Sequence, residues 1–353
     1  MGSPINKGSI NKVVGQLLSV LNTRSKDVIA RRFGLKSGKK ETLDGIGQDY
    51  GITRERVRQI EEVALKQMRA NLDSGFDKVT APYLVAAGAT LEEHGGTLKD
   101  DQLFNEVFGD TKDKSAIAGL TLILSLGNQF KRYGETDNLH GFWTISDKHA
   151  ENSTKAVASL VGAFTKNQEP VHENDLLNFY KKSTPNSSNI SSKAFGAVLN
   201  LSKDIGKSIF NEVGLVDWSN IKPRGVRDKA FLVLKRNGKP QHFRDITKLI
   251  NLANFSSRKA NVQTVHNELI KDKRFVLIGR GTYGLAEWGY KAGTVKDVLV
   301  DLIRSSGKPL AKAELVSQVL NHRLVKENTI LLNLQDSKVF KKTENGAYTL
   351  REA

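Results

Sequence analysis

Four segments spread along the chain end in closely similar residues. They read GFWTI (141–145), VGLVDW (213–218), YGLAEW (283–288) and GAYTL (346–350). Alignment of Ile145, Leu215, Leu285 and Leu350 gives spacings of 70, 70 and 65 residues. Upstream of each ending, an apolar helical stretch stops at a turn, and Pro170, Pro240 and Pro309 lie in three of these turns. A repeat of about this length predicts a row of small modules after residue 75, because each repeat forms one packing unit.

The last copy gives the order of elements inside one module. Helical apolar spacing covers 294–306, 311–322 and 326–337. The stretch KVFKKTENGAYTL (338–350) then reads as two short strands joined by a turn at Asn345 and Gly346. The third copy, 223–289, shows the same order of three helical stretches and a hairpin. Three small helices closed by a β-hairpin form a winged helix, so this is the arrangement we expect for the modules.

Ahead of the repeats, the segment TLDGIGQDYGITRERVRQIEEVALKQMR (42–69) predicts a helix-turn-helix. Thr42 and Thr53 stand where two helices begin and can cap them, while Gly51 supplies the turn. The apolar stripe of the second helix comprises Val57, Ile60, Ala64 and Met68. In this geometry the first turns of the second helix enter the major groove of DNA.

The outward side of that second helix carries Arg54, Glu55, Arg58 and Gln59. Arginine can donate two hydrogen bonds to guanine, glutamine pairs with adenine, and glutamate accepts from cytosine N4. We therefore expect these four side chains to contact DNA bases. A solvated surface helix is the alternative interpretation, although such helices more often alternate Glu and Lys.

These observations predict a mainly α fold with small β-hairpins, in which a helix-turn-helix domain precedes tandem winged-helix modules. The predicted domains are the helix-turn-helix domain at 10–72, module 1 at 76–148, module 2 at 150–220, module 3 at 223–289 and module 4 at 290–353.

The charge of the chain favours a polyanionic partner. The 54 lysines and arginines exceed the 38 aspartates and glutamates, which gives a net charge of +16. Nucleic acid is the first candidate and an anionic membrane surface the second. The absence of cysteine excludes disulfides and cysteine-based zinc sites. The longest apolar run, LTLILSL (120–126), is too short to span a membrane, and the first ten residues do not form a signal peptide, so we expect a cytoplasmic location.

Module 3 concentrates this positive charge. Residues 223–280 contain 14 lysines and arginines and 4 acidic residues, a net charge of +10. A generically basic, solvated face is the alternative, but such a concentration favours contacts with DNA phosphates. The candidates are Arg258, Lys259, Lys271, Lys273, Arg274 and Arg280.

The sequence shows no catalytic, metal or cofactor signature. The seven histidines are scattered and form no i, i+4 pair. Gly279, Gly281 and Gly284 spell G-x-G-x-x-G, but strand-like residues follow them, whereas a dinucleotide site needs a helix there. Positive φ angles in a hairpin turn explain these glycines better. We therefore expect no enzyme activity, no cofactor and no metal.

The segment at 24–69, from RSKDVIARRFGL to ITRERVRQIEEVALKQMR, resembles region four of the primary sigma factors of bacterial RNA polymerase. That domain reads the promoter −35 element. The resemblance assigns base contacts to Arg54, Glu55, Arg58 and Gln59, and makes Thr42, Thr53, Arg56 and Lys66 candidates for phosphate contacts. It also implies an apolar core, part of which docks on the β flap of RNA polymerase core in the family. That face comprises Leu17, Leu18, Leu21, Val28, Ile29 and Phe33.

The chain also departs from the sigma family. Only about 20 residues precede the motif, whereas a sigma factor carries there the regions that bind the polymerase clamp and melt the −10 element. We therefore expect that this chain alone does not open a promoter.

Residues 223–350 resemble the HARE-type winged helix of the RNA polymerase delta subunit and of some DNA-modifying or chromatin proteins. The shared features are an apolar helix, a GKP turn and a final G-x-Y-x-L, although module 3 ends Y-G-L. Delta is acidic, whereas module 3 is strongly basic.

Together these patterns predict a bacterial or phage transcription factor that binds double-stranded DNA through its helix-turn-helix and through basic modules. One alternative is a delta-like polymerase accessory protein that does not read DNA sequence. Another is the DNA-recognition subunit of a modification or defence system. The sequence carries no signal for an oligomeric state.

Overall fold

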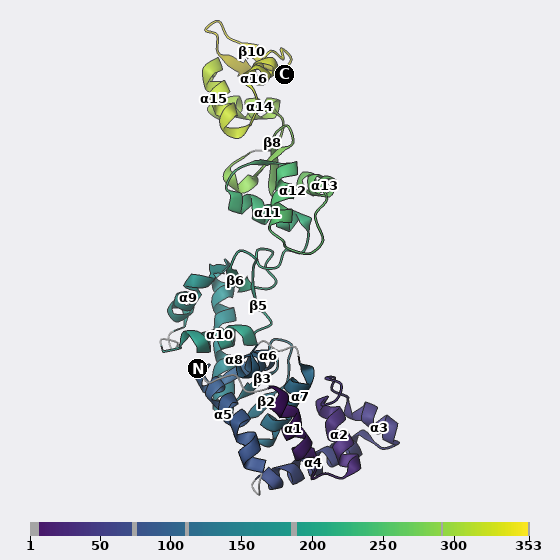
Figure 1. Cartoon of the computed structure of the whole chain (residues 1–353). Coiled ribbons are helices and arrows are strands. Elements are labelled where there is room, and N and C mark those ends of the chain that lie inside the picture. Colours follow the sequence, from purple (N-terminus) through teal and green to yellow (C-terminus); the bar gives the residue numbers. More distant parts are fainter. Residues whose placement is uncertain (1–6, 73–75, 110–112, 185–188, 291, 352–353) are drawn as a thin grey trace. The chain divides into compact units, whose positions relative to one another are not determined.

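The computed structural model describes residues 7–72, 76–109, 113–184, 189–290 and 292–351 (Figure 1). The chain divides into two compact units. Unit 1 comprises Met1–Lys207 and Asn211–Val216, and unit 2 comprises Ser208–Phe210 and Asp217–Ala353. The described residues are mainly helical and form small antiparallel sheets of two or three strands. The predicted mainly α fold with small hairpins is thereby confirmed.

Unit 1 begins with four helices that contain the predicted helix-turn-helix. They are α1 (Lys7–Leu18), α2 (Thr23–Phe33), α3 (Leu43–Tyr50) and α4 (Arg54–Asn71). The side chains of Asn22, Thr42 and Thr53 cap α2, α3 and α4 by accepting a backbone N–H of the first turn. The two threonine caps are those predicted from the sequence.

One order of elements then recurs: a helix, a short strand, two helices and two strands. In module 1 these are α5 (Asp77–Glu93), β1 (Thr97–Lys99), α6 (Asp100–Phe108), α7 (Lys114–Leu126), β2 (Lys131–Tyr133) and β3 (Phe142–Thr144). In module 2 they are α8 (Asp147–Asn167), β4 (Val171–His172), η2 (Glu173–Asp175), α9 (Leu176–Ser183), α10 (Ser192–Leu201), β5 (Ile205–Lys207) and β6 (Glu212–Leu215).

Unit 2 repeats this order. Module 3 contains α11 (Val226–Asn237), β7 (Gln241–His242), α12 (Phe243–Leu252), α13 (Val262–Lys271), β8 (Phe275–Gly279), β9 (Thr282–Leu285) and η3 (Ala286–Trp288). Module 4 contains α14 (Val295–Ser306), α15 (Lys312–His322), α16 (Glu327–Leu334), β10 (Phe340–Lys342) and β11 (Tyr348–Leu350). The predicted third helix of module 4, 326–337, is shorter than expected at its C-terminal end.

A short strand that the sequence did not predict completes each sheet. The strand orders are β1-β3-β2, β4-β6-β5 and β7-β9-β8, so the early strand pairs with the last strand of its module. In module 4 a single bridge between Leu310 and Tyr348 takes its place. In modules 2 to 4 this strand or bridge directly follows Pro170, Pro240 or Pro309, where a residue without an N–H can precede a strand.

The predicted hairpin of module 3 is confirmed, and it places two of the three G-x-G-x-x-G glycines on strands. Gly281 occupies the turn with a φ of +69°. Gly279 ends β8 and Gly284 lies within β9, and neither has a positive φ. The expectation of positive φ is therefore right for one of the three glycines.

The core of unit 1 extends across the predicted boundary between the helix-turn-helix domain and module 1. One buried cluster contains Leu17 of α1, Ile29 of α2 and Met68 of α4 together with Leu120 of α7, and all four are 0% exposed. Helix α7 packs directly on α1, since a Cβ atom at Gly119 would lie 3.1 Å from Val14 Cγ2. The two segments therefore share one core.

Modules 3 and 4 have separate cores. Leu234, Ile246 and Leu285 are each 0% exposed in the first, and Leu299 and Leu315 are each 0% exposed in the second. Among the described residues, no helix has both the length and the apolar character needed to cross a membrane.

Candidate nucleic-acid interface

Helices α3 and α4 meet in a tight turn. Gly51 adopts a left-handed conformation with a φ of +64°, and Ile52 N–H donates to the carbonyl oxygen of Gly47 over 2.9 Å. A Cβ atom at Gly47 would lie 2.7 Å from the carbonyl oxygen of Ile52, which is closer than side chains tolerate. Only glycine at position 47 permits this close approach of the turn to α3.

A small apolar cluster underlies the two helices. Val28, Ile46 and Val57 are each 0% exposed and bring α2, α3 and α4 together. Ala64 and Met68 continue the buried stripe of α4, as the sequence predicted. With this stripe facing inward, the opposite side of α4 is left in contact with solvent.

Ion pairs also tie α2 to the helix-turn-helix. The guanidinium of Arg31 binds the carboxylates of Glu41 and Asp49. Arg32 Nε donates to Glu61 Oε2 over 3.0 Å, and its Nη1 donates to the carbonyl oxygen of Glu41 over 2.6 Å. Sequence reasoning missed these contacts, because partners so far apart along the chain have no recognisable spacing.

The four residues predicted to contact bases all lie on the exposed side of the first two turns of α4. Arg54, Glu55, Arg58 and Gln59 are exposed. The structure thus brings them together on one surface, as the helix-turn-helix prediction requires. Their contacts with bases stay a prediction.

Two carboxylates already occupy Arg58. Its Nη2 lies 2.7 Å from Glu55 Oε1, and its Nη1 lies 2.8 Å from Glu62 Oε1. The hydrogen bonds from Arg58 lower the pKa of Glu55, and the two carboxylates raise the pKa of Arg58. The i, i+4 spacing of Arg58 and Glu62 could have revealed this partner in the sequence. A guanine that binds Arg58 would compete with these carboxylates for the N–H groups of its guanidinium.

The candidates for phosphate contacts near α4 have different local roles. Thr42 Oγ1 accepts the N–H of Gly45 over 3.0 Å, and Thr53 Oγ1 accepts that of Arg56 over 3.2 Å. Arg56 Nη1 donates to Gln59 Oε1 over 3.1 Å. Lys66 is exposed and lies about 10 Å further along α4 than Gln59, given a rise of about 1.5 Å per residue.

Removal of the Thr53 cap should weaken the first turn of α4. We expect Thr53→Ala to lower the free energy of unfolding of unit 1 by about 1 kcal/mol, because one N–H of that turn loses its acceptor. Urea titration followed by circular dichroism measures the change. Thr53→Ser keeps the hydroxyl and should stay close to the parent chain, and an equal loss of stability in both variants would contradict the capping role.

The basic candidates of module 3 separate into paired and unpaired side chains. Arg274 Nη2 lies 2.9 Å from Asp228 Oδ1 and 2.6 Å from Asp272 Oδ2, so its guanidinium is already engaged within the module. Lys271 Nζ lies 4.0 Å from Glu268 Oε1. The other four candidates have no ion pair within the described part of the chain, and they are Arg258, Lys259, Lys273 and Arg280.

The apolar face of α1 and α2 is mostly internal. Leu17, Leu18, Leu21, Val28 and Ile29 are at most 8% exposed, and Phe33 is partly buried. Several of them pack in the core that includes α7. A groove of about 610 Å³ remains at its edge, lined by Leu18, Leu21, Ala30 and Leu35 among others. Within the described ranges, no group of three His, Asp or Glu side chains could hold a metal ion.

Comparisons with known proteins concern the same part of the chain. Residues 17–70 match the family Sigma-70, region 4. RNA polymerase sigma factor SigA of Clostridium acetobutylicum is 40% identical over 70 residues, covering 19% of this chain and 18% of that protein. SigA1 of Synechococcus elongatus is 42% identical over 65 residues, covering 18% and 16%. Sigma factor sigF of Arabidopsis thaliana, a chloroplastic protein, is 39% identical over 70 residues, covering 20% and 13%.

The chain therefore spans less than a fifth of the length of these curated relatives. The matched segment includes all of α2, α3 and α4 up to its last turn. Residues 17–70 form a Sigma-70 region 4 domain of the helix-turn-helix type.

Proposed function

We propose that the chain is a non-enzymatic, DNA-binding transcription factor of the bacterial or phage cytoplasm that reads a −35-like promoter element. The observation that carries this proposal is the exposed set Arg54, Glu55, Arg58 and Gln59 on the first turns of α4, within the segment that matches Sigma-70, region 4. Their donors and acceptors suit base edges in the major groove.

Modules 1 to 4 would act in the same protein as winged-helix modules, and module 3 would add phosphate contacts that do not depend on DNA sequence. Its unpaired basic side chains and its net charge of +10 over 223–280 support this role. For binding that rests on phosphate contacts, the logarithm of the binding constant falls linearly with the logarithm of the salt concentration, with a slope of about −0.9 per phosphate neutralised.

The test is a binding titration of the full chain against a duplex containing TTGACA and a scrambled duplex of equal length, at two salt concentrations. We expect preference for the TTGACA duplex, and we expect Arg58→Ala with Gln59→Ala to abolish it, because alanine cannot hydrogen-bond to a base at either position. Each such pairing is worth about 1–3 kcal/mol of discrimination.

Arg304→Ala is the matched control, since Arg304 is an exposed arginine on a helix of unit 2. It should leave the preference intact. Equal binding of the parent chain to both duplexes would refute promoter reading.

A second candidate is a polymerase accessory protein that docks without reading sequence. The groove of about 610 Å³ beside α1 and α2 favours it, because its apolar residues, such as Leu18 and Leu21, lie beside charged ones, such as Lys26, and can together accept a partner side chain or helix. The same titration with RNA polymerase core present separates the two candidates. Tight association with polymerase together with equal binding to both duplexes would support the accessory role.

A further inference from the structure

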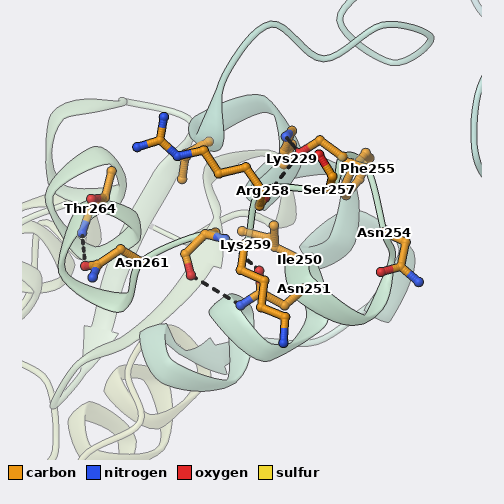
Figure 2. Close-up of a pocket in the computed structure, with 13 residues that line it drawn as sticks. Lys229, Ile250, Asn251, Asn254, Phe255, Ser257, Arg258, Lys259, Asn261 and Thr264 are labelled. Atoms are coloured by element: carbon orange, nitrogen blue, oxygen red, sulfur yellow. Dashed lines mark hydrogen bonds between the residues drawn. The ribbon is translucent and has the colours of Figure 1, made fainter.

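Module 3 contains a cavity that the helix-turn-helix does not involve. It has a volume of about 430 Å³ and lies between α11, α12 and the loop that leads into α13 (Figure 2). Its lining includes Lys229, Asn254, Ser257, Arg258, Lys259 and Thr264. This volume is within the range of about 300–1,000 Å³ typical of ligand sites.

Hydrogen bonds hold the loop of this cavity in one conformation. Asn251 Oδ1 accepts the N–H of Ala260 over 2.7 Å, and Asn251 Nδ2 donates to the carbonyl oxygen of Ala260 over 3.2 Å. Lys229 Nζ donates to Ser256 Oγ over 3.2 Å. The loop thus presents its side chains from a fixed backbone, which lowers the entropic cost of binding a ligand.

The lining is positively charged and contains no acid. Lys229, Arg258 and Lys259 are its charged residues, and none of the 13 lining side chains is a carboxylate. In the part of the chain that the structure describes, no carboxylate pairs with these three cations. Figure 2 shows Arg258 and Lys259 leaving the loop in different directions, with Lys229 on α11.

This situation differs from that of neighbouring cations. Arg227 Nε lies 3.6 Å from Glu268 Oε2, and the guanidinium of Arg274 forms ion pairs with Asp228 and Asp272. Within the described residues, no carboxylate neutralises the three cations at the cavity, a property that they share with Lys273 and Arg280 elsewhere in the module. The backbone N–H groups of Gln263 and Thr264, in the first turn of α13, already donate to Asn261 Oδ1 over 2.8 Å and 3.3 Å. The positive charge at the cavity therefore comes from side chains and not from the N-terminus of this helix.

We propose that this cavity binds a phosphate group of a nucleic-acid backbone, with Arg258 and Lys259 as the principal contacts and Lys229 at the inner wall. The inference rests on the proposed DNA-binding function and names the site through which module 3 takes part in it. A guanidinium can donate two parallel hydrogen bonds to phosphate oxygens, and a lysine adds a point charge. The amide of Asn254 and the hydroxyls of Ser257 and Thr264 supply further donors.

The first experiment compares double variants of the full chain on the scrambled duplex, where promoter reading does not contribute. Arg258→Gln with Lys259→Gln should weaken binding several-fold and reduce the salt slope by about 0.9 for each phosphate that the variant no longer neutralises. Lys235→Gln with Lys248→Gln removes the same charge from exposed lysines of the same module that have acidic partners. This control should change binding far less, and equal weakening by the two double variants would overturn the proposal.

The second experiment measures lysine acylation by mass spectrometry, with and without duplex. Duplex should protect Lys259 and Lys229, whereas Lys312 on α15 serves as the reference. Protection by duplex but not by millimolar inorganic phosphate supports a nucleic-acid backbone. Equal protection by inorganic phosphate would show that the cavity binds a free phosphate or a nucleotide and would overturn the assignment to a nucleic-acid backbone. If the duplex protected neither lysine, the proposal that the cavity binds phosphate would be overturned.

Failure of this inference and failure of the proposed function give different results. If promoter reading fails, the TTGACA and scrambled duplexes bind equally, yet the cavity variants still weaken binding. If the cavity does not bind phosphate, the preference for TTGACA persists, and the double variant of Arg258 and Lys259 behaves like its charge-matched control.

Discussion

Replacement of Leu120 by alanine is expected to destabilise the helix-turn-helix, although Leu120 lies outside the segment that matches Sigma-70, region 4. Leu120 is 0% exposed on α7 and belongs to the same core as Leu17, Ile29 and Met68. Its truncation should lower the free energy of unfolding of unit 1 by about 2–5 kcal/mol, because the shorter side chain buries less apolar surface and leaves a cavity.

Urea titration with tryptophan fluorescence measures this change. The chain has three tryptophans, and replacement of Trp218 and Trp288 by phenylalanine leaves Trp143, which lies in the same core as Leu120, as the reporter of unit 1. Leu332→Ala is the matched control, because Leu332 is 66% exposed. If α4 kept its full stability in Leu120→Ala, measured by hydrogen exchange, the shared core would not support the helix-turn-helix.

Gly47→Ala is expected to disturb the crossing of α3 and α4. The new methyl group would lie 2.7 Å from the carbonyl oxygen of Ile52, and a backbone atom cannot move aside as a flexible side chain can. Overpacking of this kind lowers the free energy of unfolding by about 1–3 kcal/mol. Because α4 must shift to relieve the contact, we also expect the preference for the TTGACA duplex to fall.

Gly15→Ala gives the control for this substitution. Gly15 lies inside α1, and a Cβ atom there would have no heavy atom within 4 Å. Alanine at that position should leave DNA binding unchanged and stabilise the helix by up to about 1 kcal/mol. A Gly47→Ala chain as stable and as selective as the parent would show that the turn can relax at no cost.

Local sequence signals predicted the helix-turn-helix well. Thr42, Thr53 and Gly51 each act within a few residues, so capping and turn chemistry identify their roles. The short strands after the prolines escaped prediction because two residues carry no measurable periodicity. The third helix of module 4 ends early, which illustrates that helix ends are less well specified than helix centres.

Contacts between distant residues could not be predicted in this way. Nothing in the local pattern of Arg274 reveals its pairing with Asp228, which lies 46 positions earlier. The same holds for the packing of α7 on α1, since both helices read as ordinary apolar elements. The cavity in module 3 also depends on tertiary structure, because Lys229 and Lys259 meet only when α11 and the loop before α13 fold together.

The carboxylates beside Arg58 have a consequence for how the chain would search DNA. Residues 54–62 contain three arginines and three glutamates, so the surface that would read bases has no net charge, whereas residues 223–280 carry +10. Under the proposed function, attraction to arbitrary DNA would reside mainly in module 3, and α4 would gain little from a backbone it does not recognise. A chain built in this way would stay near DNA while its recognition helix samples and leaves wrong sequences quickly. Rising salt would shorten the residence time on all DNA while altering the choice between sequences much less.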